Sequence, residues 1–114
     1  MALHHLGLDV DVTDVQDAQT VLFTIERMLG LIERGLSRHH PAVYRNVTLP
    51  VWEAVERKVR NIAEWVFEIN RIHEGNIVIM PRIMHLSGIL ERVAVLVDQG
   101  RFVIDATRAL RRML

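Results

Sequence analysis

The chain has 114 residues, of which half are hydrophobic, and its 14 basic and 14 acidic side chains cancel to a formal net charge of zero at pH 7. This length favours one domain, and the charge balance excludes a strongly basic nucleic-acid-binding protein and an acidic tail, although it allows local charged patches. Because the chain has no cysteine, disulfides, thiolate catalysis and Cys-based zinc sites are excluded.

The apolar content favours self-association, because a chain this small leaves much of its surface in water. The alternative is a Val- and Ile-rich thermostable monomer. The opening segment MALHHLGLDV has neither the basic region nor the long apolar region of a signal peptide. No apolar run approaches the ~18 residues of a membrane span. We therefore expect no transmembrane segment, and a location in the cytoplasm or within an assembled particle.

A ladder of apolar residues predicts a first helix over residues 14–38. Its members are three and four positions apart, which places them along one seam of a helix that must meet other helices. Thr13 and Gln16 fit a capping box at its start. The members of the ladder are Val15, Ala18, Leu22, Ile25, Leu29, Ile32 and Leu36.

A second helix is predicted over residues 49–74. Thr48 suits the N-cap, Pro50 falls in the first turn, where its missing N–H costs nothing, and Gly75-Asn76 is a stop signal. His73 continues the seam of this helix. The apolar members of the seam are Trp52, Val55, Val59, Ile62, Val66 and Ile69.

The remaining sequence predicts a third helix over residues 81–99 and a short fourth helix over 101–113, separated at Gly100. The alternative is one long helix in which Gly100 is only a weak point. The preceding run, Ile77 to Met80, is interpreted as a buried linker, with strand pairing between copies as the alternative. The third seam consists of Ile83, Leu86, Leu90, Val93 and Val97.

These elements predict an all-α, heptad-patterned bundle of three long helices plus a short C-terminal helix, forming a single domain over residues 1–114. A second apolar line lies beside the seams of the first two helices, and a helix with two apolar stripes contacts more than one neighbour. The candidate oligomer interface is drawn from this line: Val21, Met28, Leu31, Trp65, Phe67 and Ile72.

The C-terminal helix is amphipathic, with Phe102, Ala106, Ala109 and Met113 on one side and arginines across from them. Clustered arginines are candidate contacts for phosphate or an acidic partner, although arginine near a helix C-terminus also complements the helix dipole. Residues 1–38 hold six acids and three arginines, a net charge of −3, whereas residues 92–114 hold two acids and five arginines, a net charge of +3. The candidate contacts are Arg101, Arg108, Arg111 and Arg112.

Histidine is the residue type that invites a metal site, but the Glu-x-x-His and His-x-x-x-His spacings of helical metal sites do not occur. We therefore expect no metal and no cofactor. His73 is predicted to be a core or interface histidine bonded to a carbonyl, and His85 to be exposed. The pair His39-His40 lies in a loop, where it could bind metal adventitiously. Neither serine of the chain has a base placed beside it by spacing, so no catalytic residue is predicted.

The function expected from these patterns is that of a non-enzymatic, self-associating helical structural or interaction module, a homodimer or a higher oligomer. The alternative is a nucleic-acid-associated assembly subunit, such as a viral or phage coat or packaging protein, whose arginine-bearing faces would line the nucleic acid. A metal-binding or catalytic helical bundle is the third hypothesis.

Overall fold

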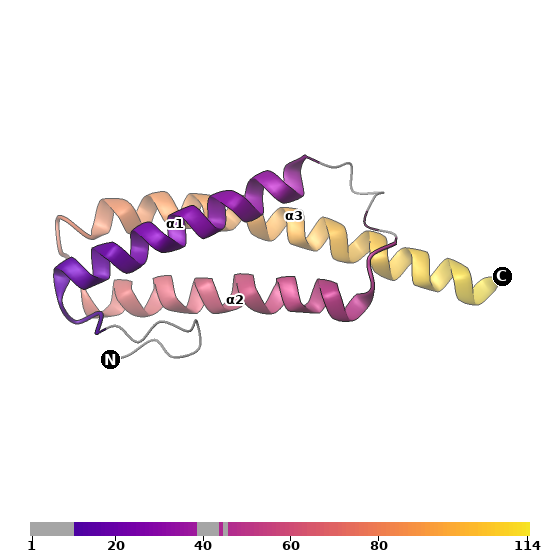
Figure 1. Ribbon diagram of the computed structural model, residues 1–114, viewed down its shortest axis with the longest axis horizontal. Coiled ribbons are helices and arrows are strands. Elements are labelled where there is room, and N and C mark those ends of the chain that lie inside the picture. The colour runs from indigo at the N-terminus through magenta and orange to yellow at the C-terminus, as the bar shows by residue number, and fades with distance from the viewer. Residues whose placement is uncertain (1–10, 39–43, 45) are drawn as a thin grey trace.

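The structure, a computed structural model, describes residues 11–38, 44 and 46–114. These residues contain three α-helices. They are α1 (Val15–Ser37), α2 (Leu49–Ile72) and α3 (Met80–Met113). Helices α1 and α3 run in the same direction and α2 runs in the opposite direction, and α3 continues past the end of the bundle (Figure 1). The predicted all-α class is confirmed. The molecule is a rod with extents of 56 × 24 × 19 Å.

The start of α1 is capped by Asp14, and the predicted capping box at Thr13 is wrong by one residue. The Asp14 carboxylate accepts hydrogen bonds from the N–H groups of Gln16, at 2.9 Å, and Asp17, at 3.0 Å. Thr13 instead donates through its N–H and its hydroxyl to the carboxylate of Asp11. An aspartate is as good an N-cap as a threonine, and its charge also suits the positive end of the helix dipole.

The predicted boundaries of α2 are nearly correct. Thr48 occupies the N-cap position, although its side chain makes no capping hydrogen bond, and Pro50 lies in the first turn. After the helix ends, Gly75 adopts a positive φ of 82°, which glycine tolerates at no steric cost. The side chain of Asn76 then accepts hydrogen bonds from the N–H groups of Val78 and Ile79, which leads the chain directly into α3.

The segment from Ile77 to Met80 is a turn followed by the first residue of α3, and the described residues contain no strand there. The predicted buried linker is wrong for its first half, because Ile77 is 88% exposed and Val78 is 50% exposed. Ile79 is fully buried and packs into the core. The strand alternative is not supported, because the N–H groups of Val78 and Ile79 donate to the side chain of Asn76 and the N–H of Met80 donates to its backbone oxygen.

Gly100 does not interrupt α3, so the predicted fourth helix is the C-terminal part of one 34-residue helix. The glycine is explained by packing. A Cβ atom at position 100 would lie within 3.0 Å of three atoms of the Trp52 ring. Sequence patterns mark glycine as a helix breaker, but here its lack of a side chain lets α2 and α3 approach one another.

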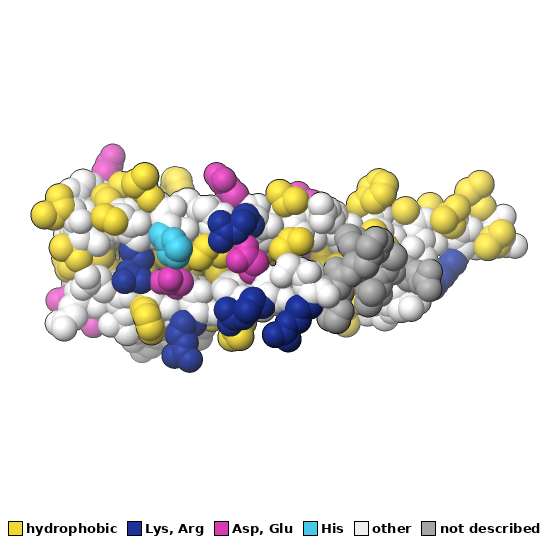
Figure 2. Space-filling view, turned by 90° about the horizontal axis from the view of Figure 1, so that it is seen from above, with side chains coloured by type: hydrophobic (Ala, Val, Ile, Leu, Met, Phe, Trp, Pro, Cys, Tyr) yellow, Lys and Arg dark blue, Asp and Glu magenta, His cyan; other side chains and the backbone are white. Residues whose placement is uncertain are grey.

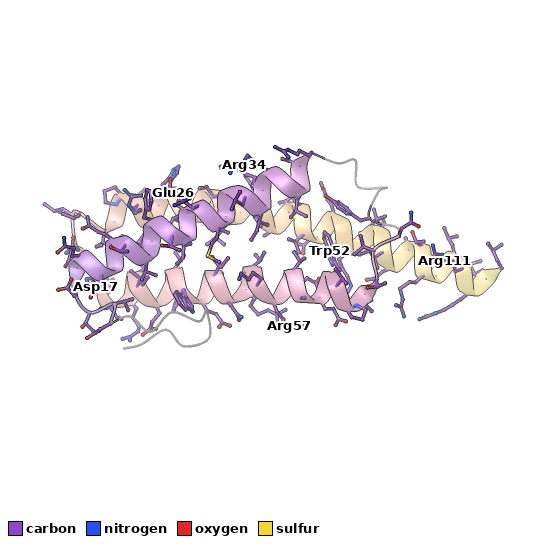
Figure 3. The ribbon with its side chains drawn as sticks, viewed as in Figure 1. Asp17, Glu26, Arg34, Trp52, Arg57 and Arg111 are labelled. Atoms are coloured by element: carbon purple, nitrogen blue, oxygen red, sulfur yellow. The ribbon has the colours of Figure 1, made fainter. Side chains whose placement is uncertain are left out.

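The core lies between the three helices and contains many members of the predicted ladders. Fully buried side chains come from every helix, and they include Trp65 on α2. Figure 3 shows side chains of α1 and α2 directed into the space between the helices. Along α3 the buried positions are Ile83, Leu86, Ile89, Val93, Val97, Gly100 and Ile104.

Candidate association surface

Helix α3 is long enough to project beyond its neighbours. Its 34 residues span about 51 Å, whereas the 23 and 24 residues of α1 and α2 span about 35 Å each. The last buried side chain of α3 is Ile104, which is 2% exposed. We call residues 105–114 the overhang; they extend past the first turn of α2 (Figure 1).

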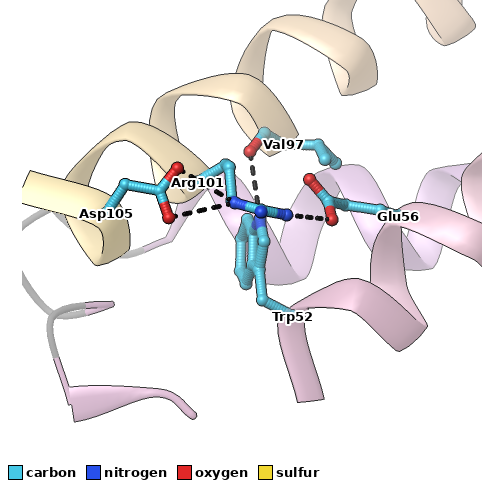
Figure 4. Close-up of polar contacts among 5 residues, drawn as sticks. All are labelled: Trp52, Glu56, Val97, Arg101 and Asp105. Carbon is cyan, nitrogen blue, oxygen red and sulfur yellow. Dashed lines mark hydrogen bonds and ion pairs between the residues drawn. The ribbon is translucent and has the colours of Figure 1, made fainter. Parts of the chain in front are cut away.

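The base of the overhang is held by Trp52. Its indole N–H donates to the backbone oxygen of Val97, at 3.2 Å, across the contact between α2 and α3 (Figure 4). The ring of Tyr44 lies against Trp52, with centroids 5.0 Å apart, and the Tyr44 hydroxyl donates to the backbone oxygen of Leu36, at 2.6 Å. Burial raises the pKa of Tyr44. These contacts tie the end of α1 and the start of α2 to α3.

Arg101 is engaged within the chain. Its Nη1 atom lies 2.7 Å from a carboxylate oxygen of Glu56 on α2, and its Nε–H points at Asp105 one turn further along α3 (Figure 4). The hydrogen bond to Asp105 and the charge of Glu56 both raise the pKa of Arg101. Of the four candidate arginines, Arg101 is therefore the one that already has two carboxylate partners.

The other three arginines of the candidate set, Arg108, Arg111 and Arg112, are exposed on the overhang. Arg108 and Arg111 line a small hollow beside residues 46–50 at the start of α2. No ion pair joins any of the three to another described residue. Arg111 and Asp17 lie toward opposite ends of the molecule (Figure 3), so the charge asymmetry of the sequence extends along the rod.

An apolar strip follows the side of α3 that faces away from the core. Phe102 is 74% exposed, Met113 81%, Leu110 62% and Val95 56%. Hydrophobic side chains gather where α3 projects (Figure 2). We define the outer face of α3 as Val95, Leu96, Gln99, Phe102, Val103, Ala106, Ala109, Leu110 and Met113.

A groove adjoins the outer face where α1 ends. It is lined by Glu33, Arg34 and Ser37 of α1 and by part of the outer face, including Val95 and Leu96. Arg92 of α3 also lines the groove and forms an ion pair with Glu33, at 2.7 Å, which raises the pKa of Arg92. The groove extends the outer face toward α1.

The predicted interface residues fall into three groups in the structure: buried, partly buried and exposed. Val21 and Trp65 are 2% and 0% exposed, so they belong to the core of the single chain and are removed from the candidate surface. Met28 and Ile72 are partly buried against the core. The two that remain on the surface, Leu31 and Phe67, lie on different helices and are 64% and 70% exposed.

The sequence patterns predicted the apolar side of residues 101–113 but did not assign the outer face of α3 to the interface. Splitting α3 at Gly100 separated Val95, Leu96 and Gln99 from the residues that follow them. A single uninterrupted ladder of three- and four-residue steps from Val95 to Met113 is the signal that identifies the whole face.

Two predictions about histidine are confirmed. His73 is 8% exposed, and its Nε2 atom lies 2.5 Å from the backbone oxygen of Val12, to which the ring donates. The side chain of His85 is 59% exposed and lies 3.2 Å from Glu26. The pair His39-His40 falls outside the described residues.

The described residues contain no cluster of three or more His, Cys, Asp or Glu side chains able to hold a metal ion. Among the three described helices, none combines the length and the apolar character that crossing a membrane requires.

Together these features define the class of the protein: an all-α, three-helix chain whose last helix projects from the bundle with an apolar outer face and exposed arginines. Comparisons with protein-family models, with curated proteins and with solved structures found no match.

Proposed function

We propose that the protein is a self-associating helical module whose interface is the outer face of α3. The observation that carries this proposal is a difference between the two sides of the overhang. On the side that faces the core, the apolar positions end at Ile104. On the outer face they continue through Leu110 and Met113, the second of which is 81% exposed.

The side of α3 that faces the core becomes polar as soon as no other helix covers it. The positions that follow Ile104 at helical spacing are Thr107, Arg108 and Arg111. A helix face that remains in water does not require an apolar side chain at every turn. Contiguous exposed apolar patches instead mark interaction sites. The outer face keeps its apolar character over the same turns, which supports a partner on that side.

Exposed apolar residues elsewhere lack this continuity. Phe67 is 70% exposed on α2, but its neighbours one turn away are Glu64 and Arg71. Single apolar side chains of this kind are ordinary on protein surfaces. Ile77, Val78 and Met84 are exposed toward the opposite end of the rod, but Ile77 and Val78 lie in the turn before α3 and only Met84 is on a helix.

Light scattering coupled to size-exclusion chromatography tests the proposal. The expected result is a discrete dimer or higher oligomer at high micromolar concentration, and Phe102→Gln should shift the population toward the 13.2 kDa monomer. Phe67→Gln is the matched control, because it removes a similarly exposed ring from α2 and should leave the mass unchanged. A monomer at every concentration, or equal effects of both variants, would contradict the proposal.

A second candidate function is an assembly subunit that contacts nucleic acid. It is supported by Arg108 and Arg111, which are exposed beside the start of α2 without a described carboxylate partner. Phosphate contacts require clustered cations and weaken steeply with salt. Purified protein would then carry nucleic acid, seen in the ratio of absorbance at the nucleic-acid and protein maxima and removed by nuclease or high salt. A preparation free of nucleic acid at low salt would contradict this candidate.

A further inference from the structure

We propose that two copies of the chain pair α3 with α3 in antiparallel orientation, with the two-fold axis near Ile104. This arrangement rests on the self-association proposed above and specifies its geometry. Because Ile104 is the last buried residue of α3, an axis at this position places each bundle beyond the end of the other. Only residues 95–114 of the two helices then overlap, and the bodies of the bundles point away from one another.

The side chains of the outer face are complementary in this orientation. Steps of three and four residues allow an antiparallel helix pair to interdigitate in layers. The axis near Ile104 sets Phe102 against the partner's Ala106, and Val95 against the partner's Met113. Each large side chain thus meets a smaller or flexible one, as close packing requires. The central polar residue, Gln99, falls opposite the partner's Ala109.

The flanks of the outer face point to the same register. On one flank, Asp98 comes opposite the partner's Arg112, and the two-fold axis repeats this ion pair. Both residues are exposed, and neither has an ion-pair partner among the described residues of its own chain. On the other flank, Leu96 meets the partner's Leu110, and Val103 lies next to the partner's Val103.

A parallel pair fits the same residues less well. Identical side chains share a layer in a parallel two-fold pair, so Phe102 would meet the partner's Phe102 while Ala106 would face the partner's Ala106. The carboxylate of Asp98 would then lie beside the partner's Val103 instead of a cation. Opposite charges across a helix pair set its orientation, and here they favour the antiparallel arrangement.

The groove beside α1 also suits the antiparallel pair. The overhang of the partner extends along residues 95–99, where Val95, Leu96 and Gln99 line the groove together with Ser37 of α1. The partner's Leu110 and Met113, which have no cover in a single chain, lie over this groove. In this arrangement the overhang of each copy therefore covers the groove of the other copy.

The size of the contact sets the expected affinity. An overlap of 20 residues gives a contact about 30 Å long and one helix wide. The area that this contact buries is smaller than the ~800 Å² per partner of a typical stable complex. We expect a dissociation constant on the order of 10 μM. Sedimentation equilibrium from about 1 to 300 μM covers the transition.

Charge reversal tests the register. Asp98→Arg and Arg112→Asp each place like charges opposite one another at two symmetric positions, and each should weaken the dimer about tenfold. The double variant restores opposite charges and should return the dissociation constant to within about threefold of the original. Glu64→Arg, on the exposed side of α2, is the control and should change nothing. Failure of the double variant to recover would overturn the register.

Cysteine cross-linking tests the orientation, because the chain has no cysteine of its own. Val95→Cys and Met113→Cys chains, mixed and oxidised gently, should give mainly the mixed disulfide dimer. A predominance of dimers linked between two copies of the Val95→Cys chain would overturn the antiparallel arrangement and leave self-association standing. A monomer in sedimentation at all concentrations would overturn both proposals. Far-ultraviolet circular dichroism of every variant checks that the helices remain folded.

Discussion

The ring of Trp52 occupies the space that a side chain at Gly100 would need. The contact is anchored by the hydrogen bond from the indole N–H to the backbone oxygen of Val97, at 3.2 Å. It fixes how closely α2 approaches α3 at the base of the overhang. Because a Cβ at position 100 would lie within 3.0 Å of three ring atoms, the pair depends on glycine for close approach and not for flexibility.

Gly100→Ala should therefore destabilise the fold, although alanine is the better helix former. Replacing a mid-helix glycine gains about 1 kcal/mol of helix propensity, whereas overpacking a core contact costs about 1–3 kcal/mol and more where nothing can move. Because the Cβ would overlap the Trp52 ring, we expect the upper end of that cost and therefore a net loss of about 1–2 kcal/mol in the free energy of unfolding, measured by urea denaturation.

Gly88→Ala is the matched control for this prediction. A Cβ at position 88 would meet only the end of the Arg92 side chain, at 3.8 Å, so this variant should gain up to about 1 kcal/mol. In a Trp52→Phe background the ring is smaller, and the cost of Gly100→Ala should fall, which a double-mutant cycle would reveal. Equal costs in both backgrounds would show that the two positions are not coupled.

Tyr44 gives the fold a dependence on alkaline pH. Burial raises its pKa above the ordinary value of 10.0, so the folded chain holds the phenol proton more tightly than the unfolded chain. The resulting stability is present below the unfolded pKa and is lost as pH rises through the folded value. Tyr44 is the only tyrosine, so tyrosinate absorbance should titrate at higher pH in the native protein than in denaturant. Tyr44→Phe should remove the titration and the alkaline loss of stability assigned to this group.

His73 should contribute to stability through its contact with the segment that precedes α1. The ring is 8% exposed and donates to the backbone oxygen of Val12. His73→Ala leaves that carbonyl without its partner and opens a cavity, so we expect a loss of about 2–3 kcal/mol in thermal or chemical unfolding. His85→Ala is the control: its side chain is 59% exposed, and it should change stability by less than about 0.5 kcal/mol. Equal losses in the two variants would contradict this assignment.

Sequence patterns predicted the elements that depend on local chemistry. The start of α2 at Thr48 and Pro50 and the stop at Gly75 follow from capping and backbone preferences, and the burial of His73 followed from its place on the seam. The sequence left the continuity of α3 open, with one long helix as the alternative, because the reason for Gly100 is a tryptophan 48 positions earlier in the chain. A glycine that ends a helix and a glycine that lets a neighbouring helix approach closely cannot be distinguished from a single sequence.

The sequence predicted that an apolar face would be exposed, but not which residues would form it. An apolar excess and second stripes indicated an exposed face, but Val21 and Trp65 satisfy that pattern inside the bundle. With three helices, each can have two neighbours within one chain, and periodicity does not tell which stripe meets them. The outer face of α3 has no cover because it lies opposite the core, and the unequal lengths of the helices leave the overhang uncovered on its core-facing side as well.

Arg101 links the stability of the chain to the proposed dimer. It pairs with Glu56 and Asp105, at 2.7 and 3.1 Å, and its side chain is 33% exposed. Arg101→Gln should cost the fold only about 0.5–1 kcal/mol, as partly exposed ion pairs do. In the antiparallel arrangement Asp105 lies close to the partner's Asp105, so losing the arginine leaves two carboxylates near the axis. The variant should therefore weaken dimerisation in sedimentation equilibrium about threefold to tenfold, by like-charge repulsion.

Adding Asp105→Asn to the Arg101→Gln variant should restore the dimer without restoring the stability. If the double variant dimerises no better than Arg101→Gln alone, Asp105 does not lie near the axis and the register is wrong.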